Sequence, residues 1–259
     1  MSGAVPVLTY HSIDGSGSIL SASPDVFASH LRYLTERGYR CVSLLSVVRA
    51  LKSRDPLPAR SFVITFDDGY RNNLRDALPI LKQFECTATI FIPVNYVGGT
   101  NDWPDQHESI PRVPVMTWDE IRAIRSAGVD IGAHTMSHPR LPRLTDPREL
   151  EREIVGSRDA IRAELGEEIP LFSYPYGEYD ERARAIAADA FEGAISNWPD
   201  RIRSGSDPYA LERLNATSGL FRRLPFSVLE AGRFSGYVQA KKWIGFGRSL
   251  WEVGRSRNR

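Results

Sequence analysis

The chain has 259 residues, of which 33 are basic, 32 are acidic and 42% are hydrophobic. This balance excludes a disordered chain, and a net charge of +1 gives no overall reason to expect nucleic-acid binding. The sequence contains no apolar run of 18 residues and no signal-peptide pattern, so we expect a cytoplasmic protein that does not span a membrane.

Short β-branched runs alternate with helical patterns along the chain. One helix is expected to begin at Ser23-Pro24 and to end at Gly38, and the clearest helical periodicity covers Asp146–Gly166. The strand-like runs are Pro6–Tyr10, Cys41–Ser43, Phe62–Phe66, Thr87–Pro93, Val129–Ala133, Leu171–Tyr174, Gly193–Ser196 and Leu211–Leu214. Seven or eight strands that are mostly separated by helices predict an α/β fold with a parallel sheet. Both a nearly closed barrel and an open doubly wound sheet fit this pattern, but no GxGxxG motif follows the first strand.

Two adjacent carboxylates, Asp67 and Asp68, follow the strand-like run Phe62–Phe66 and precede Gly69. A bare Asp-Asp-Gly triplet commonly makes a turn or caps a helix. This triplet stands at the carboxyl end of a buried strand, where α/β folds build their functional sites. Its position therefore favours a functional role.

Two histidines, His134 and His138, directly follow the strand-like run Val129–Ala133. Histidines four residues apart can face one ion, although surface histidines also reach this spacing by chance. Together with a carboxylate they form a ligand set suited to Zn²⁺ or another divalent transition metal. We therefore expect a metal site at this end of the sheet.

Two more strand ends carry polar residues. His11 follows the first strand, and Tyr176 lies in the Ser-Tyr-Pro-Tyr-Gly turn at 173–177. Because the carboxyl ends of parallel strands meet at one rim, these residues are expected to converge with the carboxylates and histidines. The segment Asn95–Val115 has no clear pattern, and a loop of this length is usually functional or mobile.

Three of these segments carry a family resemblance. TFDDG at 65–69, HTMSH at 134–138 and SYPYG at 173–177 resemble the first three motifs of the polysaccharide deacetylases (carbohydrate esterase family 4, the NodB-homology group). The flanking segments VLTYHSI and TWDEIRAIRSAGVDIGAHTMSHPRL agree, and the resemblance covers residues 5–215. It implies an irregular (β/α)₇-type barrel of mostly parallel strands and metal-dependent hydrolysis of an N- or O-acetyl group from a sugar.

The resemblance also implies roles for individual residues. By motif, Asp67 is the general base, and the Tyr176 backbone N–H helps to stabilise the oxyanion. The implied metal ligands are Asp68, His134 and His138.

The sequence departs from the commonest family pattern in two places. The third motif usually begins with an Arg that orients the base, but Ser173 stands here, as in the exopolysaccharide-associated subgroup with a Tyr-Pro-Tyr-Gly motif. Arg213, near a late strand end, is the candidate for the missing cation. No histidine follows His138, so the usual late general acid is absent. In related poly-N-acetylglucosamine deacetylases the acid comes from a histidine near the N-terminus, and His11 matches that position.

We therefore expect a polysaccharide N-deacetylase that removes acetyl from an N-acetylated glycan or its precursor. The expected cofactor is a divalent transition metal, with Zn²⁺ favoured and Co²⁺, Ni²⁺ and Fe²⁺ as alternatives. One alternative function is the deacylation of a lipid-linked saccharide or another small amide. The other is a non-catalytic glycan-binding barrel, which has no need for both the base Asp67 and a complete ligand set.

The predicted deacetylase domain covers residues 1–219, and a basic, aromatic tail covers 220–259. The tail has nine Lys and Arg against two Glu, a net charge of +7, interspersed with seven aromatic residues. Such a segment suits peripheral contact with an anionic membrane, which would place a cytoplasmic enzyme at the inner membrane surface. The alternative is a terminal helix that packs its aromatic side chains on the barrel; nucleic acid is not expected as a partner.

Overall fold

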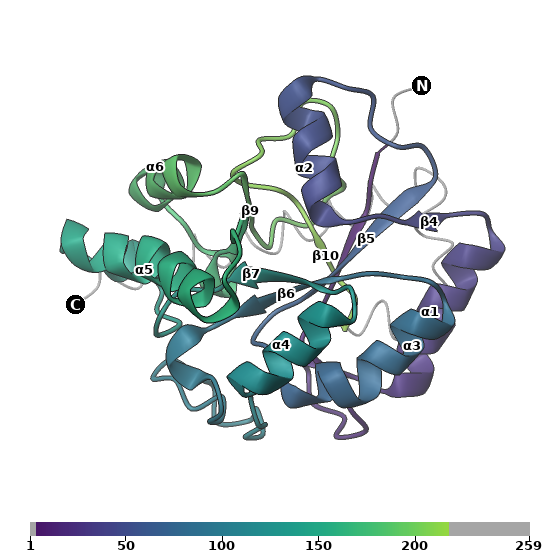
Figure 1. The fold of residues 1–259 in the computed structure, drawn as a ribbon, viewed down its shortest axis with the longest axis horizontal. Helices are drawn as coiled ribbons and strands as arrows, with labels where there is room; N and C mark the ends of the chain where they lie inside the picture. The colour runs from purple at the N-terminus through teal and green to yellow at the C-terminus, as the bar shows by residue number, and fades with distance from the viewer. Residues whose placement is uncertain (1–3, 218–259) are drawn as a thin grey trace, which may run out of the picture. The chain divides into compact units, whose positions relative to one another are not determined.

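The computed structural model describes residues 4–217. Its centre is a parallel sheet that curls into a half-barrel in the strand order β10-β1-β5-β6-β7-β8-β9 (Figure 1). These strands are β1 (Val7–Tyr10), β5 (Ser61–Phe66), β6 (Thr89–Ile92), β7 (Asp130–Ala133), β8 (Leu171–Ser173), β9 (Gly193–Ile195) and β10 (Leu214–Asn215). The short β4 (Arg40–Cys41) pairs with β5, and β2 (Ser12–Ile13) pairs with β3 (Ser21–Ala22). The curled parallel sheet confirms the expected (β/α)₇-type barrel.

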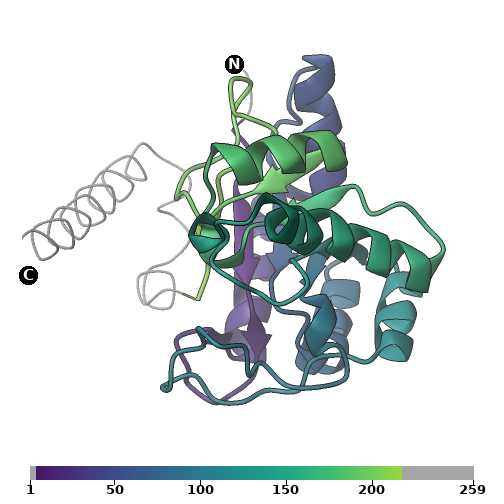
Figure 2. The ribbon, with the colours of Figure 1, turned by 90° about the vertical axis from the view of Figure 1, so that its left-hand side faces the viewer.

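Helices cover the outside of the sheet. They are α1 (Pro24–Glu36), α2 (Leu44–Ser53), α3 (Leu78–Gln83), α4 (Trp118–Ser126), α5 (Pro147–Leu165) and α6 (Glu181–Ala190). Shorter turns are the π-helical η1 (Asn73–Ala77) and the 3₁₀ turns η2 (Val94–Tyr96), η3 (Leu141–Arg143) and η4 (Pro175–Gly177). Helices α5 and α6 pack against each other beside β7–β9 (Figures 1 and 2).

The helix boundaries follow the predicted capping signals. Ser23 caps α1 by accepting a hydrogen bond from the Val26 N–H, and Pro24 occupies the first helical position. In the same way, Asp146 caps α5, and Gly166 ends that helix with a left-handed φ of 70°. Both predictions are therefore confirmed.

The predicted strand Leu211–Leu214 lies differently in the structure. Leu211 bridges to Ile195 of β9, whereas Leu214 begins β10 and pairs with Leu8 of β1. The segment therefore crosses from one edge of the sheet to the other, and Arg213 lies at this crossing. The prediction of one continuous strand is wrong here, because the chain changes its partner strand within four residues.

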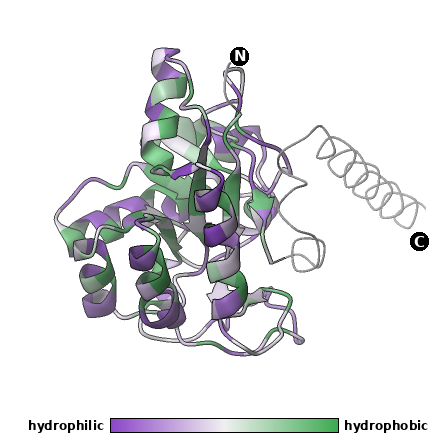
Figure 3. Ribbon diagram, turned by 90° about the vertical axis from the view of Figure 1, so that its right-hand side faces the viewer, coloured by the Kyte–Doolittle hydropathy of each residue, from purple (hydrophilic) through white to green (hydrophobic). Residues whose placement is uncertain are grey.

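The barrel interior is closed at the end opposite the carboxyl ends of the strands. Side chains from five strands form one buried apolar cluster with those of α2, and they include Val7, Val63, Phe91, Leu171, Ile195, Leu44, Val47 and Val48. Hydrophobic colours follow the strands and the sheet-facing sides of the helices (Figure 3). With this end filled by side chains, the carboxyl ends of the strands remain for a functional site.

Within residues 4–217, none of the helices combines the length and the hydrophobicity needed to cross a bilayer. The tail at 220–259 and the predicted domain boundary after residue 219 lie outside the described residues. Membrane contact by the tail therefore stays a prediction.

Two glycines provide a test of this packing. A Cβ on Gly132 of β7 would lie 2.5 Å from ring carbons of Phe91 on the neighbouring β6. We expect Gly132→Ala to destabilise the protein by about 1–3 kcal/mol through this overpacking. Gly156 lies inside α5, and its Cβ would meet no atom closer than 3.6 Å. Gly156→Ala should therefore stabilise the protein by about 0.5–1 kcal/mol through helix propensity.

Chemical denaturation of both variants, followed by circular dichroism, measures these two changes. Equal stabilities for the two variants would contradict the close approach of β6 and β7 at Gly132.

Candidate active site

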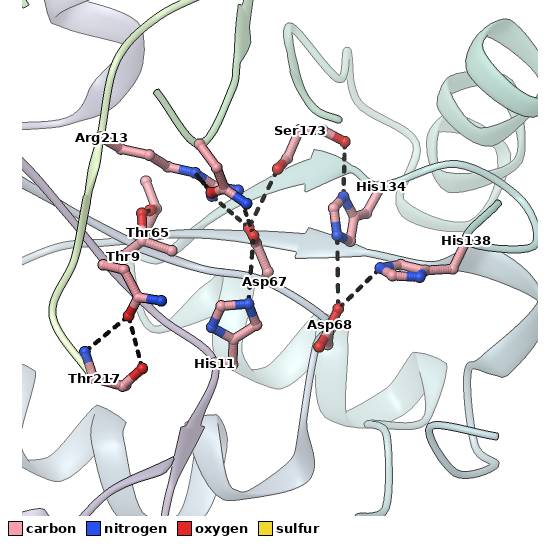
Figure 4. A network of polar contacts seen from close by, with 12 residues as sticks. Thr9, His11, Thr65, Asp67, Asp68, His134, His138, Ser173, Arg213 and Thr217 are labelled. Carbon is pink, nitrogen blue, oxygen red and sulfur yellow. Dashed lines mark hydrogen bonds and ion pairs between the residues drawn. The ribbon is translucent and has the colours of Figure 1, made fainter. Parts of the chain in front are cut away.

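A cavity of about 280 Å³ opens at the carboxyl ends of the strands. Its lining includes residues predicted at four separate strand ends, namely His11, Asp67, Asp68, His134, His138 and Tyr176. The expected convergence of these residues is therefore present in the structure. Arg213 lies beside Asp67 (Figure 4). Trp103 from the long loop also lines the cavity.

Asp68, His134 and His138 form a buried cluster with the geometry of a metal site. One ligand atom from each residue lies within 4.8 Å of the others. The Asp68 Oδ1 is 3.6 Å from His134 Nε2 and 3.4 Å from His138 Nε2 (Figure 4). Ligand atoms about 2.1 Å from a tetrahedral Zn²⁺ are separated by about 3.4 Å, so these spacings fit a shared ion. Two imidazoles and one carboxylate leave a coordination position open.

The His134 ring is held in the tautomer that a metal ligand requires. Its Nδ1 lies 2.7 Å from the Ser173 carbonyl oxygen, which can only accept a hydrogen bond. Nδ1 therefore carries the proton, and the lone pair of Nε2 faces Asp68. Burial lowers the pKa of His134 to about 4, which keeps the imidazole neutral near pH 7.

Glu153 of α5 holds the loop between the two histidines. Its buried carboxylate accepts hydrogen bonds from the backbone N–H groups of Met136 and Ser137 at 2.9 and 2.8 Å. The Ser137 hydroxyl donates to the other carboxylate oxygen at 2.7 Å. None of the sequence motifs includes Glu153. The sequence feature that could have identified it is a charged residue on the apolar face of this helix, three residues after Leu150 and directly before Ile154.

Asp67 is paired with the predicted cation. Arg213 donates from Nη1 to Oδ1 at 2.8 Å and from Nη2 to Oδ2 at 2.6 Å, and both side chains are buried. The Ser173 hydroxyl adds a longer hydrogen bond to Oδ1. Burial alone would raise the pKa of Asp67, but the Arg213 guanidinium, together with the nearby His134 and His11, holds this pKa well below its usual range. Asp67 therefore stays ionised.

Asn197 completes the support of Arg213 and was also missed. Its side-chain oxygen accepts a hydrogen bond from Arg213 Nε at 2.8 Å. The turn η4 packs against it so closely that a Cβ on Gly177 would lie 2.4 Å from the Asn197 backbone nitrogen. No sequence pattern around residue 197 predicts the contacts of Asn197 with Arg213 and Gly177, because both join residues from separate segments.

His11 and Tyr176 flank the carboxylates. The His11 Nε2 lies 3.9 Å from Asp67 Oδ2, and the side chain is 14% exposed at the cavity. Tyr176 has a left-handed φ of 59°, and its ring meets the edge of His138 at 4.8 Å. The guanidinium of Arg140 lies over the Tyr176 ring, with its central carbon 4.1 Å from the ring centroid. Both predicted residues thus lie beside the metal cluster, while their chemical roles stay predictions.

A family model described as polysaccharide deacetylase matches residues 54–191, which is more than half of the chain. The chain belongs to the polysaccharide deacetylase family. This deacetylase is 27% identical over 240 residues to Bacillus subtilis (strain 168) YxkH, which carries the name of a polysaccharide deacetylase. That match covers 92% of this chain and 77% of YxkH.

Two further matches concern named deacetylases. The deacetylase is 25% identical over 233 residues to the poly-β-1,6-N-acetyl-D-glucosamine N-deacetylase of Escherichia coli (strain K12). The match covers 73% of this chain and 34% of that longer enzyme. The solved structure of IcaB from Ammonifex degensii superposes with a TM-score of 0.75 at 24% identity, covering 85% of this chain and 95% of IcaB. That likeness shows a shared fold.

Family membership confirms the predicted reaction class. This deacetylase is a metal-dependent hydrolase that removes acetyl groups from carbohydrate, and it carries a cluster that fits the required ion. The metal content and the activity of variants test the roles of single residues.

Loss of one ligand should separate metal binding from catalysis. We expect His134→Ala to lose its metal and its activity, because two ligands remain of the three. Asp67→Asn should keep the metal and lose activity by about 10²–10⁴-fold, the usual contribution of a general base. Metal content after dialysis, measured by mass spectrometry, and acetate release distinguish the two variants. A full equivalent of metal in folded His134→Ala would exclude this ligand set.

Arg213 should set the acidic limit of activity. Because its charge lowers the pKa of Asp67, its removal raises that pKa, and the base then becomes protonated at a higher pH. The acidic limb of kcat/KM should therefore move to higher pH in Arg213→Ala, and less far in Arg213→Lys, which keeps the charge. Arg213→Ala should also destabilise the fold by about 3–5 kcal/mol, because it leaves a buried charge unpaired. Identical acidic limbs in the wild type and in both variants would contradict this pairing.

Proposed function

We propose that this deacetylase hydrolyses the N-acetyl group of N-acetylglucosamine units in a glycan chain, with Zn²⁺ as its metal. The observation that carries the proposal is the pairing of buried, ionised Asp67 with a complete ligand set and with His11 at one cavity. The names of the similar proteins supply the sugar, since the Escherichia coli relative is a poly-β-1,6-N-acetyl-D-glucosamine N-deacetylase.

Each residue has one task in the proposed reaction. When bound, a divalent ion polarises the acetyl carbonyl and lowers the pKa of a water molecule. Asp67 accepts the proton of the attacking water, while Arg213 keeps its carboxylate oriented. The Tyr176 backbone N–H donates to the oxygen that gains negative charge. His11 then gives a proton to the sugar nitrogen as the C–N bond breaks, so that acetate and an amine leave.

The donor set favours zinc among the transition metals. Two imidazole nitrogens and one carboxylate oxygen with an open position are typical of catalytic Zn²⁺ sites. Co²⁺, Ni²⁺ and Fe²⁺ accept the same donors, so supplementation of the metal-free enzyme with each ion ranks them.

A second hollow beside the cavity favours a chain over a single sugar. It has a volume of about 550 Å³ and shares Tyr176 and Asn197 with the catalytic cavity. Its lining includes Trp198, which is 52% exposed, and the partly exposed ring of Tyr179. Exposed aromatic rings beside a pocket are typical of ligand-binding surfaces, and their faces suit the apolar side of a pyranose.

The basic tail favours one other candidate substrate, a lipid-linked saccharide. Its charge and aromatic residues suit contact with an anionic membrane, where such a saccharide would be met at the cytoplasmic face. The proposed membrane contact rests on the sequence of residues 220–259 alone. Liposome co-sedimentation of the full chain and of a chain ending near Gly219 tests this candidate.

The main experiment is acetate release from a set of acetylated substrates. We expect Zn²⁺-loaded enzyme to act on β-1,6-linked N-acetylglucosamine oligomers, with Asp67→Asn as the inactive control that retains metal. Chitin oligomers, O-acetylated sugars and lipid-linked N-acetylglucosamine complete the set. Exclusive release from O-acetyl substrates would refute the amide assignment, and exclusive release from the lipid-linked sugar would favour the second candidate.

Trp198 should matter only for longer substrates. An aromatic contact contributes about 0.5–1.5 kcal/mol, so Trp198→Ala should lower kcat/KM for a pentamer by about 2–12-fold. The same variant should leave hydrolysis of a dimer unchanged, because a dimer need not reach beyond the catalytic cavity. Initial rates over oligomer lengths of two to six measure this dependence. A uniform loss at all lengths would contradict a separate subsite at Trp198.

A further inference from the structure

We infer that Trp103 is a positioning residue for the metal ligand His138, whose ring orientation it fixes by stacking. This inference rests on the metal site of the proposed function and adds a residue that neither the motifs nor the family match assigns.

The two histidine ligands are supported in different ways. His134 donates from Nδ1 to the Ser173 carbonyl, which fixes both its tautomer and its ring plane. The Nδ1 of His138 is buried and has no hydrogen-bond partner among residues 4–217. Metal-bound histidines almost always donate this second N–H to a carbonyl, a carboxylate or water. Another contact must therefore hold the His138 ring.

Aromatic rings enclose the His138 imidazole instead. The Trp103 ring lies over it at a centroid distance of 4.3 Å and an interplanar angle of 31°. Tyr176 and His134 meet the imidazole at 4.8 Å with steep angles of 69° and 73°. A rotation of the imidazole about its Cβ–Cγ bond would drive it into the indole. The stacked indole thus restricts the direction in which Nε2 presents its lone pair to the ion.

Trp103 is itself firmly seated. It is 3% exposed and belongs to a small apolar cluster with Tyr70 and Val115. The Tyr96 ring meets its edge at 5.3 Å and an angle of 77°. The indole therefore belongs to a packed aromatic cluster, and the His138 ring packs against that cluster.

Asn101 fastens the loop that carries Trp103. The side chain is fully buried, and its oxygen accepts a hydrogen bond from the Val113 N–H at 2.6 Å. Its amide nitrogen donates to the Pro111 carbonyl and to the Tyr70 hydroxyl. Tyr70 follows the ligand Asp68 by two residues, so one packed unit supports two of the three metal ligands. The long segment Asn95–Val115 thereby gains a function at the metal site.

The test is the Zn²⁺ affinity of the full-length metal-free enzyme, measured by competition with a chromophoric chelator. Changes in residues that orient ligands typically cost about 10–100-fold in metal affinity, and we expect such a loss for Trp103→Leu. Leucine keeps apolar bulk but has no planar face. Trp103→Phe restores a stacking ring and should recover most of the affinity. Trp198→Ala, which changes an exposed indole outside this aromatic cluster, serves as the control for metal affinity.

A second readout reports the geometry directly. The absorption spectrum of the Co²⁺-substituted enzyme should change in Trp103→Leu and stay near the wild-type spectrum in Trp103→Phe. Wild-type Zn²⁺ affinity in Trp103→Leu, or equal losses in the leucine and phenylalanine variants, would overturn the inference. Because neither readout uses a sugar substrate, failure of the proposed substrate would leave this result intact.

Discussion

The active site depends on how two adjacent buried carboxylates are neutralised. Asp67 and Asp68 are neighbours in the chain, and both side chains are almost fully buried. Burying an unpaired charge costs several kcal/mol, so each carboxylate needs its own cation. Arg213 pairs with Asp67 through two hydrogen bonds, and Asp68 faces two histidines with the spacing of a metal site. This division leaves one carboxylate ionised and free of the metal cluster, as a general base requires.

The division of charge depends in turn on closure of the barrel. Arg213 comes from the segment that leaves β9 and pairs with β1, so it reaches Asp67 only when both edges of the sheet are in place. The histidine loop after β7 is likewise held from outside, by Glu153 of α5. Each chemical group is therefore supported by an element distant in sequence.

Several residues of the active site have a strained backbone conformation. Four residues at the site have a left-handed φ although they are not glycine, namely Asp68, Thr135, His138 and Tyr176. Each such residue costs of order 1–3 kcal/mol and persists only when its surroundings enforce it. The enforcing contacts are visible, since Thr135 accepts a hydrogen bond from the His138 N–H and Gly177 packs against Asn197. Asp68 is one of these residues, and its carboxylate faces His134 while that of the preceding Asp67 pairs with Arg213.

Local sequence patterns determined the helix caps at Ser23 and Asp146, the βα alternation, and the strand ends that carry the predicted base and metal ligands. These features depend on residues a few positions apart, and parallel strands necessarily bring their carboxyl ends to one rim. Only the tertiary structure decided which distant side chains meet there. The pairing of Arg213 with Asp67, the hold of Glu153 on the histidine loop and the stacking of Trp103 on His138 all join separate elements. Such contacts are set by strand register, loop path and side-chain packing, and these arise from the whole fold rather than from any short segment.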